Sequence, residues 1–340
     1  MSISSARLYG IATLALGTLS AAQDLGVPSG WRESSNKYSQ AALVGNAVAG
    51  INAIMPQLTS YDAQFNGIGY WQGANVWSNL ANNDHWAATT AYQSEVVTNL
   101  NTAWSLYANY DKWGFNDDAL WWGSAAYYAY RAYDDSGMLA NAVATWNHVS
   151  NYVITAADAS AGSMSTKNFT IKGTCNGATM AGGVFWVRPD LSSSIFNLSM
   201  ASPLICVAVH DSTDIDAITT FDWIKGQVLN SDYLVLDTVQ ANNCTTSPAT
   251  ELFTYNSGKA VEGLAVLAAV TGDAQWSDLC TNIVVAAVKN TVWQGANGVI
   301  TEAFHSADAA RICALAVLLR GLHEVYARST NSDLKTLIHS

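Results

Sequence analysis

The sequence predicts an all-α fold. Apolar residues recur at the 3.6-residue spacing of amphipathic helices along most of the chain, and short polar breaks separate these stretches. Sequence typical of strands is scarce. In chain order, we expect helices over residues 35–57, 70–82, 87–109, 117–133, 137–156, 193–210, 214–230, 257–271, 275–290 and 305–327.

Two of these helices have further support. In the third, Trp104 and Tyr107 lie at helical spacing, as expected for core or groove-filling aromatic residues. The fourth opens with Asp117 and Asp118, and the helix dipole stabilises acidic residues in a first turn.

One segment departs from the helical pattern. Residues 233–239 read as a strand, because they are mostly apolar and β-branched. We expect this strand to pair with residues 252–255 across a loop that holds Cys244. The all-α fold then carries a small β-hairpin excursion.

The expected helices form one domain. No interior linker rich in Pro, Gly or Ser interrupts them, so we expect a single domain over residues 23–340, long enough for a substantial core. All-α chains of this size form bundles, solenoids or closed double rings of helices. No fixed repeat period is visible, which argues against a regular solenoid. Periodicity alone does not choose between the other two.

The amino terminus predicts export. Residues 1–22 read as a secretory signal, in which Arg7 precedes a short apolar run over residues 11–16 and small residues offer a cleavage site at 20–22. The run is too short for a membrane span. The carboxyl terminus lacks the long apolar tail of a GPI signal. We therefore expect a freely secreted protein, outside the cell or in the cell wall, with no membrane anchor.

Sequons and cysteines agree with an extracellular location. We expect glycosylation at the three sequons, which begin at Asn168, Asn197 and Asn243. Of five cysteines, Cys175 and Cys244 lie in polar, loop-like sequence beside sequons, and we expect a disulfide between them. The other three lie in apolar helical runs where buried free thiols are expected, namely Cys206, Cys280 and Cys313.

The amino-acid composition limits the classes of molecule that the protein is expected to bind. Charged residues make up only 12% of the chain, and the net charge is -11. Such a surface repels nucleic acid and anionic lipid, and it suits a neutral polymer. No spacing typical of a metal site is present, and we expect no metal, no cofactor and a monomer.

The residues with the clearest chemistry lie between Asn116 and Trp122, where two adjacent aspartates are followed by two tryptophans. A retaining glycosidase needs two carboxyl groups about 5 Å apart, and aromatic rings hold sugars. The alternative is structural: Asp117 is then a helix-start residue stabilised by the dipole, and Asp118 a solvated neighbour. The residues alone favour this alternative.

A resemblance reverses that preference. Four blocks occur in the order and roughly the spacing seen in the α-1,6-mannanases of glycoside hydrolase family 76, and the chain resembles this family, including its fungal cell-wall members, from about residue 40 to about 325. The blocks are Tyr70-Trp71-Gln72-Gly73-Ala74-Asn75, Asp117-Asp118-x-x-Trp121-Trp122, Gly182-Gly183-Val184-Phe185-Trp186 and Thr254-Tyr255-Asn256-Ser257-Gly258. The resemblance implies an (α/α)6 barrel whose inner helices surround a cleft.

The resemblance also implies roles for the two acids. Asp117 is expected to be the nucleophile, kept ionised by N–H groups at the helix start, and Asp118 the general acid/base, with a pKa raised by its neighbour's charge. Their titrations must be coupled. Asp117 would attack the anomeric carbon to form a covalent intermediate, and water would then release the sugar. Configuration at the anomeric carbon is thereby retained.

Substrate contacts are expected from the same blocks. Neighbouring helical residues point about 100° apart, so one of Trp121 and Trp122 is expected to pack inward and the other to face the cleft. Gly183 and Trp186 are expected to form a backbone approach and a stacking face, or a turn before a packed tryptophan. Further contacts are expected from Asp237, Tyr255 and Asn256. Asp237 has the alternative of a solvated carboxylate at a strand end.

Departures from the family bear on substrate contacts. Residues 193–199 lack the Lys-Asn pair, and the Asn and Glu after it, that family members usually carry there. Ser257 stands where Gln is common. Residues 312–314 stand where Phe-Lys-Gly is typical. The leading hypothesis is a secreted endo-α-1,6-mannosidase acting on α-mannan. The others are a mannosyl transglycosylase of the cell wall, which needs the same two acids, and a non-catalytic carbohydrate-binding wall protein, which the intact aspartate pair argues against.

Overall fold

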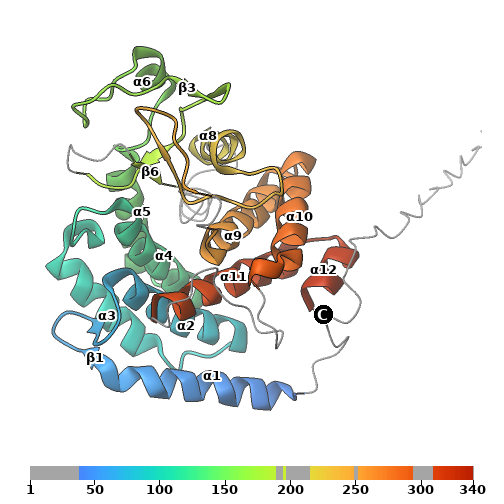
Figure 1. The fold of residues 1–340 in the computed structure, drawn as a ribbon. Coiled ribbons are helices and arrows are strands. Elements are labelled where there is room, and N and C mark those ends of the chain that lie inside the picture. The colour runs from blue at the N-terminus through green and yellow to red at the C-terminus, as the bar shows by residue number, and fades with distance from the viewer. Residues whose placement is uncertain (1–37, 189–193, 197–214, 249–251, 294–308, 340) are drawn as a thin grey trace, which may run out of the picture.

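The computed structural model describes residues 38–188, 194–196, 215–248, 252–293 and 309–339, and these are mostly helical (Figure 1). The helices are α1(Gln40–Ile54), α2(Tyr70–Ala87), α3(Gln93–Leu106), α4(Asn116–Tyr133), α5(Ser136–Ser150), α6(Ala156–Ala161), α8(Ile215–Trp223), α9(Thr254–Thr271), α10(Ala274–Lys289), α11(Ala309–Arg328) and α12(Ser332–His339). The expected all-α class is confirmed. The α6 and α12 helices, of six and eight residues, were not expected.

Local chemistry explains where several helices begin and end. Ser39 caps α1 through its hydroxyl, and Asp135 and Asp273 cap α5 and α10 through their carboxylates. Gly162 and Gly272 end α6 and α9 in the left-handed conformation that favours glycine.

Four helices, α2, α4, α9 and α11, run parallel at the centre of the molecule. Near the start of α2 and α4, Trp71 stacks on Trp121, and further along both helices Asn82 accepts a hydrogen bond from Arg131. The helices α5 and α10 pack against α4 and α9 (Figure 1). The first turns of the four central helices therefore lie at the same end of the bundle.

Two glycines allow α9 and α11 to approach closely. A Cβ atom added at Gly321 would lie 2.0 Å from the carbonyl oxygen of Gly258, and one added at Gly258 would lie 2.6 Å from the Cα of Leu318. No side chain fits at either contact.

A buried ionic layer crosses the bundle. The Lys259 ammonium lies 2.7 Å from Glu262, which also accepts a hydrogen bond from the Tyr128 hydroxyl, and Arg320 donates to Asn75 at 3.1 Å. Burial lowers the pKa of Lys259 to about 8. Burial acts to raise the pKa of Glu262, but Lys259 and Arg320 outweigh it, so that this pKa is lowered. The layer links α2, α4, α9 and α11 through charge-assisted bonds.

The expected pairing of a strand over residues 233–239 with residues 252–255 was wrong. A three-stranded antiparallel sheet has the order β5(Val184–Phe185), β6(Ser194–Phe196), β7(Thr238–Gln240), and residues 254–255 begin α9 instead of pairing with β7. Residues 230–234 form a turn in which the Asn230 side chain accepts from two backbone N–H groups and Tyr233 has φ +59°. Leu234 then packs with residues of α10 and α11, which explains its apolar character without a strand.

The helix expected over 193–210 was also wrong at residues 194–196, which form β6. Its remainder from 197 onward lies outside the described residues, as do the expected signal sequence over 1–22, Asn197 and Cys206.

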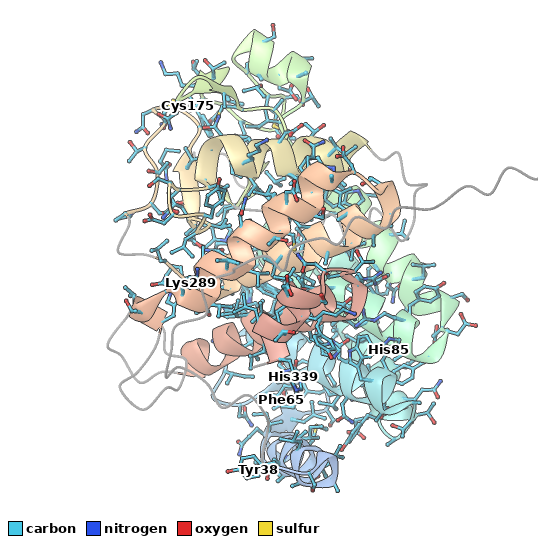
Figure 2. The ribbon with its side chains drawn as sticks, turned by 90° about the vertical axis from the view of Figure 1, so that its right-hand side faces the viewer. Tyr38, Phe65, His85, Cys175, Lys289 and His339 are labelled. Atoms are coloured by element: carbon cyan, nitrogen blue, oxygen red, sulfur yellow. A yellow bond between two sulfur atoms is a disulfide. The ribbon has the colours of Figure 1, made fainter. Side chains whose placement is uncertain are left out.

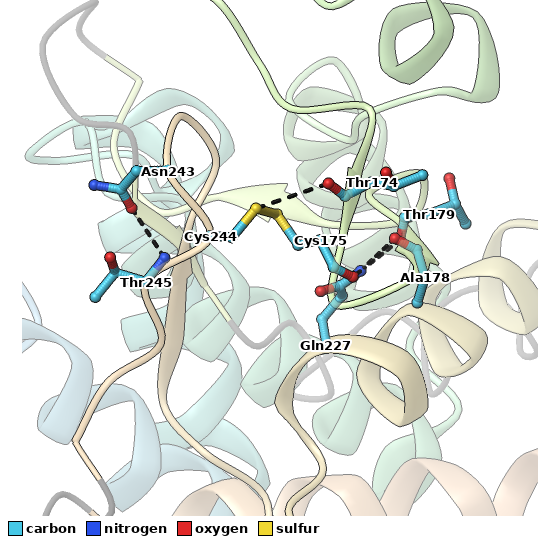
Figure 3. Close-up of a disulfide and its surroundings, with 8 residues drawn as sticks. All are labelled: Thr174, Cys175, Ala178, Thr179, Gln227, Asn243, Cys244 and Thr245. Carbon is cyan, nitrogen blue, oxygen red and sulfur yellow. Dashed lines mark hydrogen bonds between the residues drawn. A yellow bond between two sulfur atoms is a disulfide. The ribbon is translucent and has the colours of Figure 1, made fainter.

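The expected disulfide is confirmed. Cys175 and Cys244 are bonded, with their Cα atoms 5.4 Å apart (Figure 3). Beside the bond, β3(Thr174–Cys175) pairs with β4(Ala178–Thr179), and the Gln227 amide donates to three carbonyl groups of this hairpin. Cys280 is a buried free thiol, as expected, and the side chain of Cys313 is not among those described.

The disulfide lies far from the start of α1, since Figures 1 and 2 both place the regions of Cys175 and Tyr38 at opposite ends of the molecule.

Asn168 and Asn243 are exposed, and the Asn243 side-chain oxygen accepts from the Thr245 N–H at 2.9 Å. Among the helices that the structure describes, none combines the length and the apolar character needed to cross a membrane.

Candidate active site

The start of α4 is held by the chain segment that follows β5. The Asn116 N–H donates to the Trp186 carbonyl at 2.8 Å, and the Arg188 N–H donates to the Gly114 carbonyl at 2.9 Å. The Asn116 side chain adds a bond of 2.7 Å to the Phe185 carbonyl. These bonds fix the backbone immediately before Asp117 and Asp118, which occupy the first turn of α4.

The same segment places an indole on the first aspartate. Trp186 donates its ring N–H to the Asp117 Oδ1 at 2.7 Å, while its ring packs against Phe115. Both Trp186 and Asp117 are half-buried. Trp186 is therefore a direct hydrogen-bond partner of the expected nucleophile.

Burial and the charge of a neighbouring carboxylate raise the pKa of each aspartate. Burial, and then the charge of Asp118, raise the pKa of Asp117 well above its ordinary value, against the pull of the Trp186 N–H and the backbone N–H groups of Asp117 and Asp118. Burial, and then the charge of Asp111, raise the pKa of Asp118 to about 7. Both shifts favour protonation of the pair at a higher pH than two isolated aspartates would show.

Aromatic side chains gather one turn below the pair. Trp121 stacks on Trp71 with ring centroids 5.5 Å apart, and Tyr255 at the start of α9 lies about equally far from both, at 6.4 and 6.5 Å. Phe253 stacks on Tyr255 at 5.3 Å. This aromatic group joins the first two turns of three central helices.

Asp237 lies beside the aromatic group. Its Oδ1 accepts from the Tyr255 hydroxyl at 2.6 Å and from the Asn256 amide at 3.0 Å. Asp237 and Tyr255 are half-buried, whereas Asn256 is fully buried. The structure thus brings together Asp237, Tyr255 and Asn256.

Trp122 does not reach this group, which corrects the expectation that it contacts substrate. Its ring is fully buried, stacked on Tyr70 at 4.8 Å and on Tyr110 at 5.8 Å, and its N–H donates to the Tyr70 carbonyl. The two tryptophans do diverge, since Trp121 joins the aromatic group, but Trp121 is also buried, at 3% exposed, so the expectation that one of them faces the cleft is not borne out.

Gly183 does not expose its backbone either. It is buried, and its carbonyl accepts from the Ile154 N–H at 2.8 Å. Its neighbour Gly182 has φ +95°, and a Cβ atom there would lie 2.4 Å from the Thr219 carbonyl oxygen. The two glycines therefore serve a tight turn and a close packing contact, which was the alternative considered for them.

Several residues around the pair were missed. Trp71 stands in the first motif block but was not singled out, and Asp111, His148 and Arg188 belong to no motif. The Asp111 carboxylate contacts His148 and Arg188, which lie 37 and 77 positions further along the chain. These three residues therefore come together only in the folded protein. No spacing in the sequence signals such a cluster.

Among the described residues, neither a metal cluster nor the groove at the last turns of α9 and α11 contributes to the site. Among the residues that the structure describes, no cluster of three or more His, Cys, Asp or Glu side chains could hold a metal ion. A groove of about 760 Å³ is lined by residues at the last turns of α9 and α11, including Gly272 and Arg328, together with residues of α10 and α12. Because Asp117 and Tyr255 lie in first turns of parallel helices, this groove is at the other end of the bundle.

One protein family matches most of the chain. The model of glycosyl hydrolase family 76 matches residues 45–314. The chain belongs to this family. A search of curated protein sequences finds no match.

Solved structures of family 76 proteins have the same fold. One is an α-1,6-mannanase of Salegentibacter sp. HEL1_6, in an inactive variant with two consecutive aspartates replaced by alanine and in complex with α-1,6-mannotetrose; it is 15% identical, with 88% of this chain and 84% of that chain covered and a TM-score of 0.68. Another is a family 76 mannosidase of Bacteroides thetaiotaomicron, 16% identical, with 84% and 82% covered and a TM-score of 0.62.

The fold extends beyond family 76. An unsaturated glucuronyl hydrolase of Streptococcus agalactiae is 11% identical, with 89% of this chain and 79% of that chain covered and a TM-score of 0.60. The expected (α/α)6 fold is confirmed by these likenesses.

Proposed function

We propose that this family 76 protein is a secreted endo-α-1,6-mannosidase that cleaves α-mannan with retention of configuration. The observation that carries the proposal is the aspartate pair in the first turn of α4, with both pKa values raised and with Trp186 bonded to one member. The mannotetrose-bound relative supports it, since that protein was made inactive by replacing two consecutive aspartates.

The donors around the pair divide the two roles. Burial and the charge of Asp118 raise the pKa of Asp117, but Asp117 also receives the Trp186 N–H and two backbone N–H groups, all of which favour its ionised form. For Asp118, the causes of the pKa shift, burial and then the charge of Asp111, both favour the protonated form. We therefore assign Asp117 as the nucleophile and Asp118 as the general acid/base.

The reaction then has two displacements. An Asp117 oxygen attacks the anomeric carbon while the bond to the leaving sugar breaks, and Asp118 gives its proton to the leaving oxygen. Asp118 next takes a proton from water, whose oxygen attacks the same carbon and releases Asp117. Each step inverts the carbon once, so the product keeps the α configuration.

The aromatic group provides the binding surface. Trp71 and Tyr255, both half-buried, offer ring faces and edges for the apolar faces of mannose, with the buried Trp121 packed against both, and the Asp237 carboxylate accepts hydrogen bonds from hydroxyl groups. Tyr255 and Asn256 hold Asp237 in place. Asn168 and Asn243 are exposed, so both sequons are open to the glycosylation expected of an exported protein.

Incubation of the purified protein with linear α-1,6-mannan, followed by mass analysis of the products, tests the proposal. A ladder of short mannooligosaccharides is expected for endo hydrolysis. Products longer than the substrate, formed only when an acceptor glycan is added, would instead identify a transglycosylase. Binding of the mannan without any cleavage would identify a carbohydrate-binding protein and contradict the proposal.

A further inference from the structure

Asp111 is a buried carboxylate that joins three parts of the fold. Its side chain is 3% exposed. Its Oδ1 accepts from the Gly114 N–H at 2.9 Å, and its Oδ2 lies 2.5 Å from the Arg188 Nε and 2.8 Å from the His148 Nε2. Gly114 precedes α4, Arg188 follows β5, and His148 belongs to α5.

The same segments carry the two groups that meet at the pair. Gly114 lies three residues before Asp117, and Arg188 lies two residues after Trp186. Backbone bonds already join these segments, from the Arg188 N–H to the Gly114 carbonyl and from the Asn116 N–H to the Trp186 carbonyl. Asp111 adds a side-chain contact to both partners, so it fixes how Trp186 meets Asp117.

Asp111 also acts on the second aspartate through its charge. Its carboxylate is close enough to Asp118 to oppose ionisation of that residue. The cationic Arg188 and the ring of His148 face Asp111 from the other sides. Asp118 is further faced by Asp117 and by Tyr70, whose ring also carries the Lys112 ammonium at 5.4 Å from its centre. Lys112 itself donates to Gln64.

We propose that Asp111 is a positioning residue of this active site: it fixes the start of α4 against the Trp186 segment and brings a negative charge near Asp118. Arg188 sets the strength of this charge by partly neutralising it. The role of Asp118 as the general acid rests on the proposed function, whereas the positioning and the electrostatic effect do not.

Two substitutions with opposite electrostatic signs test the proposal. Asp111→Asn keeps an acceptor for Gly114 but removes the negative charge, and it leaves Arg188 uncompensated. The upper titration of the aspartate pair, followed by NMR of protein carrying carboxyl-labelled aspartate, is expected to move down by about one pH unit. Arg188→Gln leaves Asp111 uncompensated, and the same titration is expected to move up. The signals are assigned with Asp117→Asn and Asp118→Asn.

Controls separate charge from structure. Asp273→Asn changes an exposed helix cap on α10 and is expected to leave the titration unmoved. Because histidine changes charge near neutral pH, both variants are repeated in a His148→Gln background, where the opposite shifts are expected to persist. Shifts of the same sign in both variants, or no shift in variants with wild-type circular dichroism, would overturn the proposal.

The kinetic arm tests the link to function. On α-1,6-mannan, the basic limb of the kcat/KM profile is expected to shift in the same two directions as the titration. If the wild-type protein does not cleave mannan but the titrations shift as expected, the proposed function fails and the role of Asp111 stands. If mannan is cleaved and the titrations do not move, the role of Asp111 fails and the function stands.

Discussion

The Trp186 indole and the Asp117 carboxylate are joined by a hydrogen bond of 2.7 Å across 69 residues of sequence. This bond connects the segment after β5 to the first turn of α4. It places an uncharged donor on the carboxylate that we assign as nucleophile, in a setting where burial and Asp118 both oppose ionisation. The Trp186 N–H stabilises the ionised Asp117 carboxylate, and the indole does not itself take up the proton.

Trp186→Phe keeps the ring and removes the donor. We expect kcat on α-1,6-mannan to fall by about 10- to 100-fold, since a hydrogen bond to a charged group contributes about 1.5–3 kcal/mol. The matched control is Trp77→Phe, which loses an indole bond to the Ala63 carbonyl in the core. It is expected to lower stability and leave kcat unchanged. Equal losses of kcat in the two variants would remove the assigned role of Trp186.

Neutralising either aspartate is expected to remove turnover. Asp117→Asn and Asp118→Asn should each lower kcat on mannan by about a thousandfold or more, because nucleophile and proton donor are both lost as functions while the shape of the site is kept. Initial-rate assays of the two variants check this. Near-normal turnover in one variant would show that its aspartate is not catalytic.

Asp118→Asn is also expected to change how stability depends on pH. Folding raises the pKa of Asp118 from 3.8 to about 7, so between these values the folded state binds more protons than the unfolded state, and stability falls as pH rises. The Asp118→Asn variant has no proton to release at this position, so it lacks this fall of stability with rising pH. Its Tm relative to wild type should therefore increase from pH 4 to pH 8 in calorimetric scans, and a difference that is constant over this range would contradict the raised pKa.

The contact between α9 and α11 is expected to tolerate no side chain. Gly321→Ala places a Cβ atom 2.0 Å from the Gly258 carbonyl oxygen, so the helices must separate, and we expect a loss of at least about 2 kcal/mol of unfolding free energy in urea titrations. The matched control is Gly50→Ala in α1, where no atom lies within 4 Å. There we expect no loss, or a gain of about 0.5–1 kcal/mol, from helix propensity. A neutral Gly321→Ala would contradict the close approach.

The disulfide is expected to stabilise the protein by constraining the unfolded chain. Cys175 and Cys244 are 69 residues apart, a loop for which chain-entropy estimates give about 4 kcal/mol. Reducing agent should lower the Tm of the wild type but not of a Cys175→Ala/Cys244→Ala variant. Cys280→Ala, which removes the buried free thiol, should keep the wild-type response to reducing agent. A response that disappears in Cys280→Ala would point to a different bond.

The parts of the fold that sequence could predict are those set by local spacing. The helix at Asp117 was expected from residue 117 to 133 and spans 116–133, because its apolar period and acidic first turn are both local. The strand at 233–239 was misplaced, because burial of Leu234 against α10 and α11 imitates a strand pattern. Trp122 and Trp121 are indistinguishable in sequence, and only the neighbouring Tyr70 and Tyr110 decide that Trp122 is in the core. Asp111 meets His148 and Arg188 only after folding.

The stereochemistry of the first product tests the double displacement most directly. Proton NMR of the reaction on α-1,6-mannan, recorded before mutarotation, should show the α-anomer at the newly formed reducing end, because two displacements restore the starting configuration. A double displacement also requires the carboxyl groups of Asp117 and Asp118 to lie about 5–5.5 Å apart, too close to admit a water between acid and base. Initial formation of the β-anomer would contradict the assignment of Asp117 as nucleophile and require a single displacement by water.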